Sequence, residues 1–89
     1  MDEQRIIRNM RARMDAGQSF CGMLRWMADE LNLVFPNNME LLQAAFFFEF
    51  SELAILGGWS TRGWGEVSDA RVESFLTPIL WDRKERWTS

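Results

Sequence analysis

The chain has 89 residues, 47% of them hydrophobic, which is the length and composition of one globular domain spanning residues 1–89. It contains no histidine and one cysteine, Cys21, which excludes His-based catalysis, Ser-His-Asp and Cys-His nucleophiles, disulfide frameworks and zinc sites within one chain. The net charge of −3 argues against non-specific nucleic-acid binding, which requires many cationic contacts to phosphates.

The N-terminal sequence MDEQRIIRNMR is charged from its second residue and lacks the apolar stretch of a secretory signal, so we expect a cytoplasmic protein. The same segment predicts an amphipathic helix over residues 2–16. Asp2 is suited to cap this helix and Gly17 is suited to end it. Its apolar face carries Ile6, Ile7, Met10 and Met14.

Basic residues give this first helix a second feature. They are Arg5, Arg8, Arg11 and Arg13. The first three line the side opposite the apolar face. They form either a stripe that binds phosphate or an acidic partner, or an ordinary solvated face. These four arginines are the candidates for nucleic-acid binding, which is the alternative function.

A second helix is predicted over residues 19–33, with Ser19 as its N-cap. Apolar residues recur with helical spacing at Phe20, Met23, Leu24, Met27 and Leu31. Cys21 lies beside this face, where we expect a packed side chain rather than a reactive thiol. The helix has Arg25 as its only basic residue, which disfavours its use as the recognition helix of a helix-turn-helix.

The most apolar segment is NMELLQAAFFFEFSELAIL, residues 38–56, which we expect to form one central helix. Asn37 would start it, with Glu40 in capping-box spacing. The segment is apolar nearly all round, which predicts burial on more than one side. Its three glutamates argue against a membrane span. One of its two apolar stripes contains Leu41, Phe48 and Ile55, and a homodimer through this stripe is a separate hypothesis.

The sequence GGWSTRGWG, residues 57–65, combines four glycines with two tryptophans and an arginine. It lacks the pattern of a phosphate-binding loop. Trp59 and Trp64 either fold back as lids on the core or stand out as anchors for a partner. Because Trp and Arg are enriched at interface hot spots, Trp59, Arg62 and Trp64 are the candidate partner-binding residues.

The last third of the chain predicts further helix from Ser68 onward. Thr77-Pro78 should interrupt this helix, so we expect a new or kinked helix over residues 78–87. Trp87 either clamps the end of the chain onto the core or is exposed. The fold class predicted for the whole chain is all-α, a compact bundle of four to five helices around the central apolar helix.

The chemistry that the sequence offers is sparse. Glu49 and Glu52 are spaced to share a cation, but a di-metal carboxylate site also requires histidine ligands. We therefore expect no catalysis, no metal and no cofactor.

The aromatic content, the Trp-Arg-Trp loop and the acidic middle of the chain favour a non-catalytic protein–protein interaction module, a small inhibitor or adaptor of a larger protein complex. Small acidic proteins encoded by phages and plasmids share this general profile, which is an analogy from size and charge. The alternatives are a nucleic-acid-binding regulator and a purely structural subunit.

Overall fold

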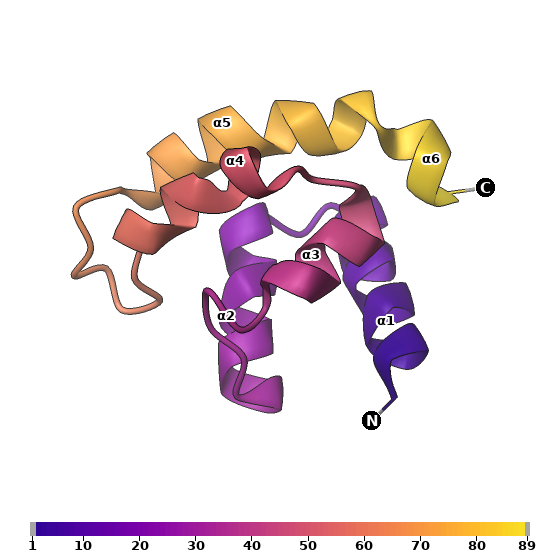
Figure 1. Cartoon of the computed structure of the whole chain (residues 1–89), viewed down its shortest axis with the longest axis horizontal. Coiled ribbons are helices and arrows are strands. Elements are labelled where there is room, and N and C mark those ends of the chain that lie inside the picture. The colour runs from indigo at the N-terminus through magenta and orange to yellow at the C-terminus, as the bar shows by residue number, and fades with distance from the viewer. Residues whose placement is uncertain (1, 89) are drawn as a thin grey trace.

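Helices make up most of the chain in the computed structural model, which describes residues 2–88 (Figure 1). The elements are α1 (Glu3–Asp15), α2 (Phe20–Leu31), α3 (Met39–Phe46), α4 (Phe50–Leu53), the 3-10 helix η1 (Ala54–Gly58), α5 (Asp69–Asp82) and α6 (Lys84–Thr88). No strand forms within residues 2–88, where Trp59 and Val67 make an isolated bridge. The prediction of an all-α bundle is confirmed.

The first two helices follow the sequence prediction closely. The side chains of Asp2 and Ser19 cap α1 and α2 by accepting hydrogen bonds from the backbone N–H groups of Arg5 (2.8 Å) and Gly22 (3.0 Å). The chain turns between the helices at Gly17, whose φ of +94° favours glycine. The two helices pack on each other, α3 packs on α1 and α6, and α5 crosses over α2 (Figure 1).

The central segment departs from its prediction, because it is two helices rather than one. α3 ends at Phe46, residues 47–49 are extended or turned, and α4 begins at Phe50 and runs directly into η1. Phe47 has a φ of +62°, in the left-handed region that residues other than glycine rarely adopt. The expectation of one uninterrupted helix over residues 38–56 is therefore wrong.

The start of this segment also differs from the prediction. Asn38, not Asn37, precedes the first residue of α3, and its side chain makes no capping hydrogen bond. Its backbone is helical, with φ −91° and ψ −1°, whereas a capping residue normally has extended backbone. The capping-box arrangement appears instead at α4, where the carboxylate of Glu52 accepts a hydrogen bond from the N–H of Glu49 at 2.7 Å.

Two arginines from distant parts of the chain stabilise the break after α3. Arg11 of α1 donates hydrogen bonds from Nε to the carbonyl of Ala45 (2.9 Å) and from Nη2 to the carbonyl of Ala44 (3.2 Å). Arg83, between α5 and α6, donates to the carbonyl of Phe47 at 2.9 Å. The last carbonyls of a helix have no partner within it, so these contacts satisfy groups that a continuous helix would have paired itself.

Arg83 also joins the two halves of the interrupted segment. Its guanidinium donates to both carboxylate oxygens of Glu52 on α4, at 2.7 and 2.9 Å, while the same side chain holds the Phe47 carbonyl at the end of α3. The side chains of Arg83 and Glu52 are only 22% and 17% exposed. A bidentate, partly buried ion pair of this kind is stronger and more directional than an exposed surface ion pair.

The break directs two neighbouring aromatic residues into one core. In a continuous helix Phe46 and Phe48 would point about 200° apart, since successive residues are offset by 100°. Here both are buried, with their rings in edge-to-face contact at 6.2 Å between centroids. Phe48 also contacts Phe20 of α2 (5.7 Å), and Phe46 contacts Trp87 of α6 (5.1 Å). These four rings connect three helices to the turn.

The stripe expected to carry a homodimer is not formed. Phe48 is 3% exposed and belongs to the core, while Leu41 and Ile55 are partly buried and pack against that core. The physical reason is the turn at residues 47–49, which places the three residues on α3, the turn and η1 rather than on one helix face. Large apolar residues elsewhere are exposed, as described below.

The C-terminal region corrects a further expectation. α5 continues through Pro78 and ends at Asp82, so the break lies at Arg83 rather than at Thr77-Pro78. Pro78 removes the donor for the carbonyl of Ser74, four residues earlier, and Ser74 is exposed to water that can replace it. Trp87 is buried, and its indole N–H donates to the carbonyl of Leu80 at 3.1 Å, which holds α6 against α5.

Replacing Arg83 by methionine should lower the free energy of unfolding by about 2 kcal/mol, because it leaves the Phe47 carbonyl unpaired and Glu52 without its cation. Urea denaturation followed by circular dichroism measures the change. Arg71→Met, at an exposed position on α5, is the matched control and should change stability by less than about 0.5 kcal/mol. Equal effects of the two substitutions would contradict a special role for Arg83.

The contribution of Glu52 should depend on pH. Hydrogen bonding to Arg83, and then to the N–H of Glu49, lowers the pKa of the Glu52 carboxyl in the folded protein. Its stabilisation is therefore complete above the ordinary glutamate pKa of about 4.3 and is lost as the pH falls through the lower, folded-state value. The difference in unfolding free energy between wild type and Glu52→Gln should be constant near neutral pH and shrink in acid. Glu85→Gln, at an exposed position on α6, controls for the loss of one charge.

Candidate functional site

The loop between η1 and α5, residues 59–68, projects from one end of the molecule, opposite the C-terminal helix (Figure 1). Its two ends are tied together, because the N–H of Val67 donates to the carbonyl of Gly58 at 2.9 Å and Trp59 bridges to Val67. A Cβ atom added at Gly65 would lie 2.8 Å from the backbone N of Ser60 and closer still to the Gly58 carbonyl. The glycine is therefore required for the two ends to approach.

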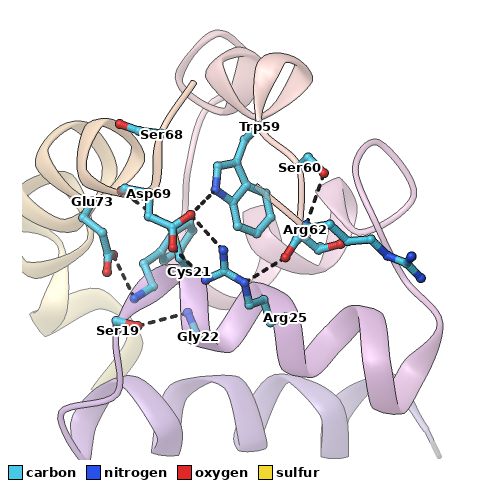
Figure 2. A network of polar contacts seen from close by, with 12 residues as sticks. Ser19, Cys21, Gly22, Arg25, Trp59, Ser60, Arg62, Ser68, Asp69 and Glu73 are labelled. Atoms are coloured by element: carbon cyan, nitrogen blue, oxygen red, sulfur yellow. Dashed lines mark hydrogen bonds and ion pairs between the residues drawn. The ribbon is translucent and has the colours of Figure 1, made fainter. Parts of the chain in front are cut away.

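A group of three side chains holds this loop on α2 and α5, and we call it the clasp: Arg25, Trp59 and Asp69 (Figure 2). The carboxylate of Asp69 accepts from the indole N–H of Trp59 at 2.8 Å and from Nη2 of Arg25 at 2.9 Å. Nη1 of Arg25 approaches the second carboxylate oxygen at 2.8 Å. Nε of Arg25 donates to the carbonyl of Thr61 at 3.0 Å, so one guanidinium holds both α5 and the loop.

The clasp has an electrostatic consequence at its centre. Hydrogen bonds from Arg25, and then from Trp59, lower the pKa of the Asp69 carboxyl below its ordinary value. The guanidinium of Arg25 also lies 5.2 Å from the centroid of the Trp59 ring. The carboxylate of Asp69 is therefore ionised at neutral pH and committed to structure, so it is a poor candidate for a general base.

The two tryptophans of the loop have different environments. Trp59 is partly buried and packs against the core, which corresponds to the lid alternative rather than the anchor alternative. Trp64 is 81% exposed, more than any other large apolar side chain among the described residues. Arg62 is also exposed, its guanidinium 5.8 Å from the Trp64 ring, and its side chain points away from the clasp (Figure 2). The candidate residues thus divide into one lid and an exposed pair.

The four arginines of α1 also differ in environment: two are held by contacts within the protein and two are exposed. Arg11 is engaged with the end of α3, as described above. Arg13 lies over the ring of Trp26, 4.0 Å from its centroid, and donates to the side chain of Gln18 at 3.3 Å. Arg5 and Arg8 are exposed. The structure therefore does not bring the four arginines together as one free basic surface.

Beside the loop lies a cleft of about 240 Å³ that the sequence did not predict. We call it the loop cleft, and its lining residues are Leu24, Val34, Phe35, Asn38, Leu56, Trp59, Ser60 and Thr61. The sequence signal was weak: Val34 and Phe35 are two apolar residues in the link between α2 and α3. The link folds back beside α2 (Figure 1) and so faces the base of the loop.

Asn38 has an unusual environment in this cleft. It is 3% exposed, and within residues 2–88 no donor reaches its Oδ1 atom. A buried acceptor without a donor typically costs about 1–3 kcal/mol, so such atoms are uncommon in folded proteins. The remaining side chains of the lining are apolar or hydroxyl-bearing. The cleft is thus an apolar hollow with an amide whose oxygen has no partner.

Cys21 and the carboxylates are the remaining side chains with reactive or metal-ligating groups. Burial, and then the nearby carboxylate of Glu73, raises the pKa of the Cys21 thiol to about 12, so the nucleophilic thiolate is scarce at neutral pH. Among residues 2–88, no three Cys, Asp or Glu side chains gather where they would bind a metal ion. No helix in this part of the chain has the length and apolar character needed to cross a bilayer.

No protein-family model matches the chain, and no curated protein or solved structure is significantly similar to it.

Substitution of the two loop tryptophans should separate their roles. Trp59→Ala removes a ring that packs on the core and a donor to Asp69, and should lower the unfolding free energy by about 2 kcal/mol or more. Trp64→Ala, at an exposed position, should change it by less than about 0.5 kcal/mol. Thermal unfolding of both variants tests this. A stability loss of similar size in Trp64→Ala would contradict its assignment as an exposed side chain.

Proposed function

We propose that the chain is a non-catalytic protein–protein interaction module, an inhibitor or adaptor of a larger protein complex, and that Trp64 with Arg62 is its anchor. The observation that carries the proposal is the 81% exposure of Trp64 on a loop that is itself held in place. Burying an indole ring removes a large apolar surface from water, and Trp and Arg are the residues most often found at the energetic centre of interfaces.

The support of the loop strengthens this argument. A flexible loop loses conformational entropy when it binds a partner, and this loss reduces the affinity. A loop that is already ordered in the free protein avoids most of this loss. The clasp and the backbone bond between Val67 and Gly58 order residues 59–68 from both ends. The tip retains a glycine, Gly63, with a φ of +80°, which gives the turn between Arg62 and Trp64 its shape. The loop is thus held in place at both ends and carries an exposed aromatic side chain near its tip.

Cationic character is a further part of the proposed anchor. The guanidinium of Arg62 stacks near the Trp64 ring, so a partner pocket that accepts the indole would meet a positive charge beside it. We therefore expect the partner surface to combine an apolar pocket with at least one carboxylate. Nucleic-acid binding has less support, because Arg11 and Arg13 are held by contacts within the protein.

The test is affinity capture from a nuclease-treated lysate of the source cell or its host, with matched bait proteins. We expect wild type to capture one protein in stoichiometric amount, and Trp64→Ala and Arg62→Ala to lose it by about tenfold or more. Phe50→Ser is the control, since it removes another exposed ring, 63% accessible, on the unrelated helix α4.

Two outcomes would contradict the proposal. Capture that is equal for wild type and Trp64→Ala would exclude this residue as the anchor. Capture that occurs only in a parallel lysate without nuclease, and that is lost on replacing both Arg5 and Arg8 by alanine, would instead indicate a nucleic-acid-binding protein.

A further inference from the structure

Two features within residues 2–88 are open to a partner: the indole ring of Trp64, which is 81% exposed, and the loop cleft, in whose lining the Oδ1 atom of Asn38 has no donor. They lie in the same region, because Ser60 and Thr61 line the cleft and Trp64 follows three residues later on the same loop. An indole needs an apolar slot and an acceptor for its N–H group. The cleft is lined mainly by apolar side chains, and the Asn38 side chain in that lining has a buried Oδ1 acceptor without a donor.

We propose that two copies of the chain form a two-fold dimer in which Trp64 of each copy enters the loop cleft of the other. In this arrangement the indole N–H of Trp64 donates to Oδ1 of Asn38, with a small rotation of the buried amide toward the cleft. A contact of this kind is reciprocal, so it closes at two copies and does not continue into a filament. The cleft, and not the Leu41, Phe48 and Ile55 stripe, is then the dimer surface.

The size of the cleft agrees with a single side chain. Sites for drug-sized ligands have volumes of about 300–1,000 Å³, and the loop cleft at about 240 Å³ lies below that range. The walls that would contact the ring come from Leu24 of α2, Phe35 of the link and Leu56 of η1. Val34, which is 47% exposed, lies at the surface of the same lining and extends its apolar area.

Charge also favours a second copy as the occupant. The incoming loop carries the exposed guanidinium of Arg62 beside Trp64. The link that supplies Val34, Phe35 and Asn38 is flanked by exposed carboxylates, Glu30 at the end of α2 and Glu40 in the first turn of α3. The approach of loop to cleft therefore brings opposite charges together, which steers association and sets its orientation.

The surface area that the proposed dimer would bury gives an expectation for its affinity. One tryptophan side chain buries at most about 250 Å², so two rings and the matching cleft walls bury on the order of 1,000 Å² in total. This is near the lower limit for specific interfaces, and it corresponds to a weak dimer that half-dissociates at about 10–100 µM.

This dimer would also regulate the proposed anchor. Trp64 cannot fill the cleft of a second copy and a pocket of another protein at the same time. Dilution, or a partner at high concentration, would therefore release the anchor from the dimer. This regulatory consequence rests on the proposed function, whereas the dimer itself does not.

The experiment is analytical ultracentrifugation from about 5 to 500 µM, together with two-dimensional amide and indole NMR over the same range. We expect the mass to rise from 10.5 kDa toward twice that value. Among the five tryptophan indole signals, the one absent from Trp64→Ala should shift with concentration, together with the side-chain amide signals of Asn38. A monomer throughout this range would overturn the proposal.

Three variants make the test specific. Asn38→Leu removes the unpartnered oxygen, so it should raise the melting temperature and weaken the dimer by about tenfold. An asparagine with a purely structural role would instead lose stability. Val34→Lys, at an exposed position, places a positive charge where Arg62 should approach and should abolish the dimer without unfolding the chain. Phe50→Ser should leave the dimer unchanged. A dimer that survives both cleft substitutions would overturn the proposal.

The same variants separate this inference from the proposed function. If Asn38→Leu and Val34→Lys lose the dimer but still capture a protein through Trp64, both proposals stand. If wild type remains monomeric while Trp64→Ala loses capture, the dimer is wrong and the anchor stands. If the dimer forms as described and no Trp64-dependent protein is captured, the dimer stands and the proposed function is wrong.

Discussion

The fold depends on the way Arg11 and Arg83 hold the C-terminal end of α3. A helix end leaves its last carbonyls unpaired, and a buried carbonyl without a donor is costly. Guanidinium groups from two distant segments supply those donors at Ala44, Ala45 and Phe47. The stabilised break is what allows the rest of the chain to pack around the segment on several sides.

The consequences of that break reach most of the core. Phe46 and Phe48 enter the same apolar interior because the chain turns between them, and their rings meet Phe20 and Trp87. Arg83 then joins the turn to α4 through Glu52, so the positions of α4 and η1 follow from the same contact. Because η1 ends where the loop begins, the placement of the loop and of the loop cleft depends on the turn as well.

The arginines of this protein differ in their contacts, and the acceptors near each side chain decide which contacts it makes. Arg11, Arg13, Arg25 and Arg83 each bond to another part of the chain, whereas Arg62 lies at the surface beside Trp64. A planar group with five donors can satisfy several acceptors at once, which suits it to joining helix ends and loops. The helical spacing of Arg5, Arg8 and Arg11 predicts one stripe on α1, but spacing does not show which of these arginines has an acceptor nearby.

The helical class, the N-terminal caps of α1 and α2, and the buried faces of both helices follow from the sequence alone, whereas α2 ends at Leu31, two residues before its predicted end. The class, the caps and the faces follow from local spacing and from side chains such as Asp2 and Ser19 that bond within three residues of their own position. The sequence also indicated the loop, because glycine and tryptophan together are unusual, but the predicted range 57–65 begins inside η1, and the loop itself spans residues 59–68. The sequence could not decide whether Trp59 and Trp64 are lids or anchors.

Tertiary structure decided the features that depend on contacts between distant residues. At the turn, the carbonyl of Phe47 accepts a hydrogen bond from Arg83, 36 residues later, and local helix preference alone predicts no break there. The clasp joins Arg25 to Asp69 across 44 positions, and it makes Trp59 a lid while Trp64 is left outside. The loop cleft draws its lining from four separate segments. Local preference sets which helices form, but burial and hydrogen bonding across the chain set where they end and what remains exposed.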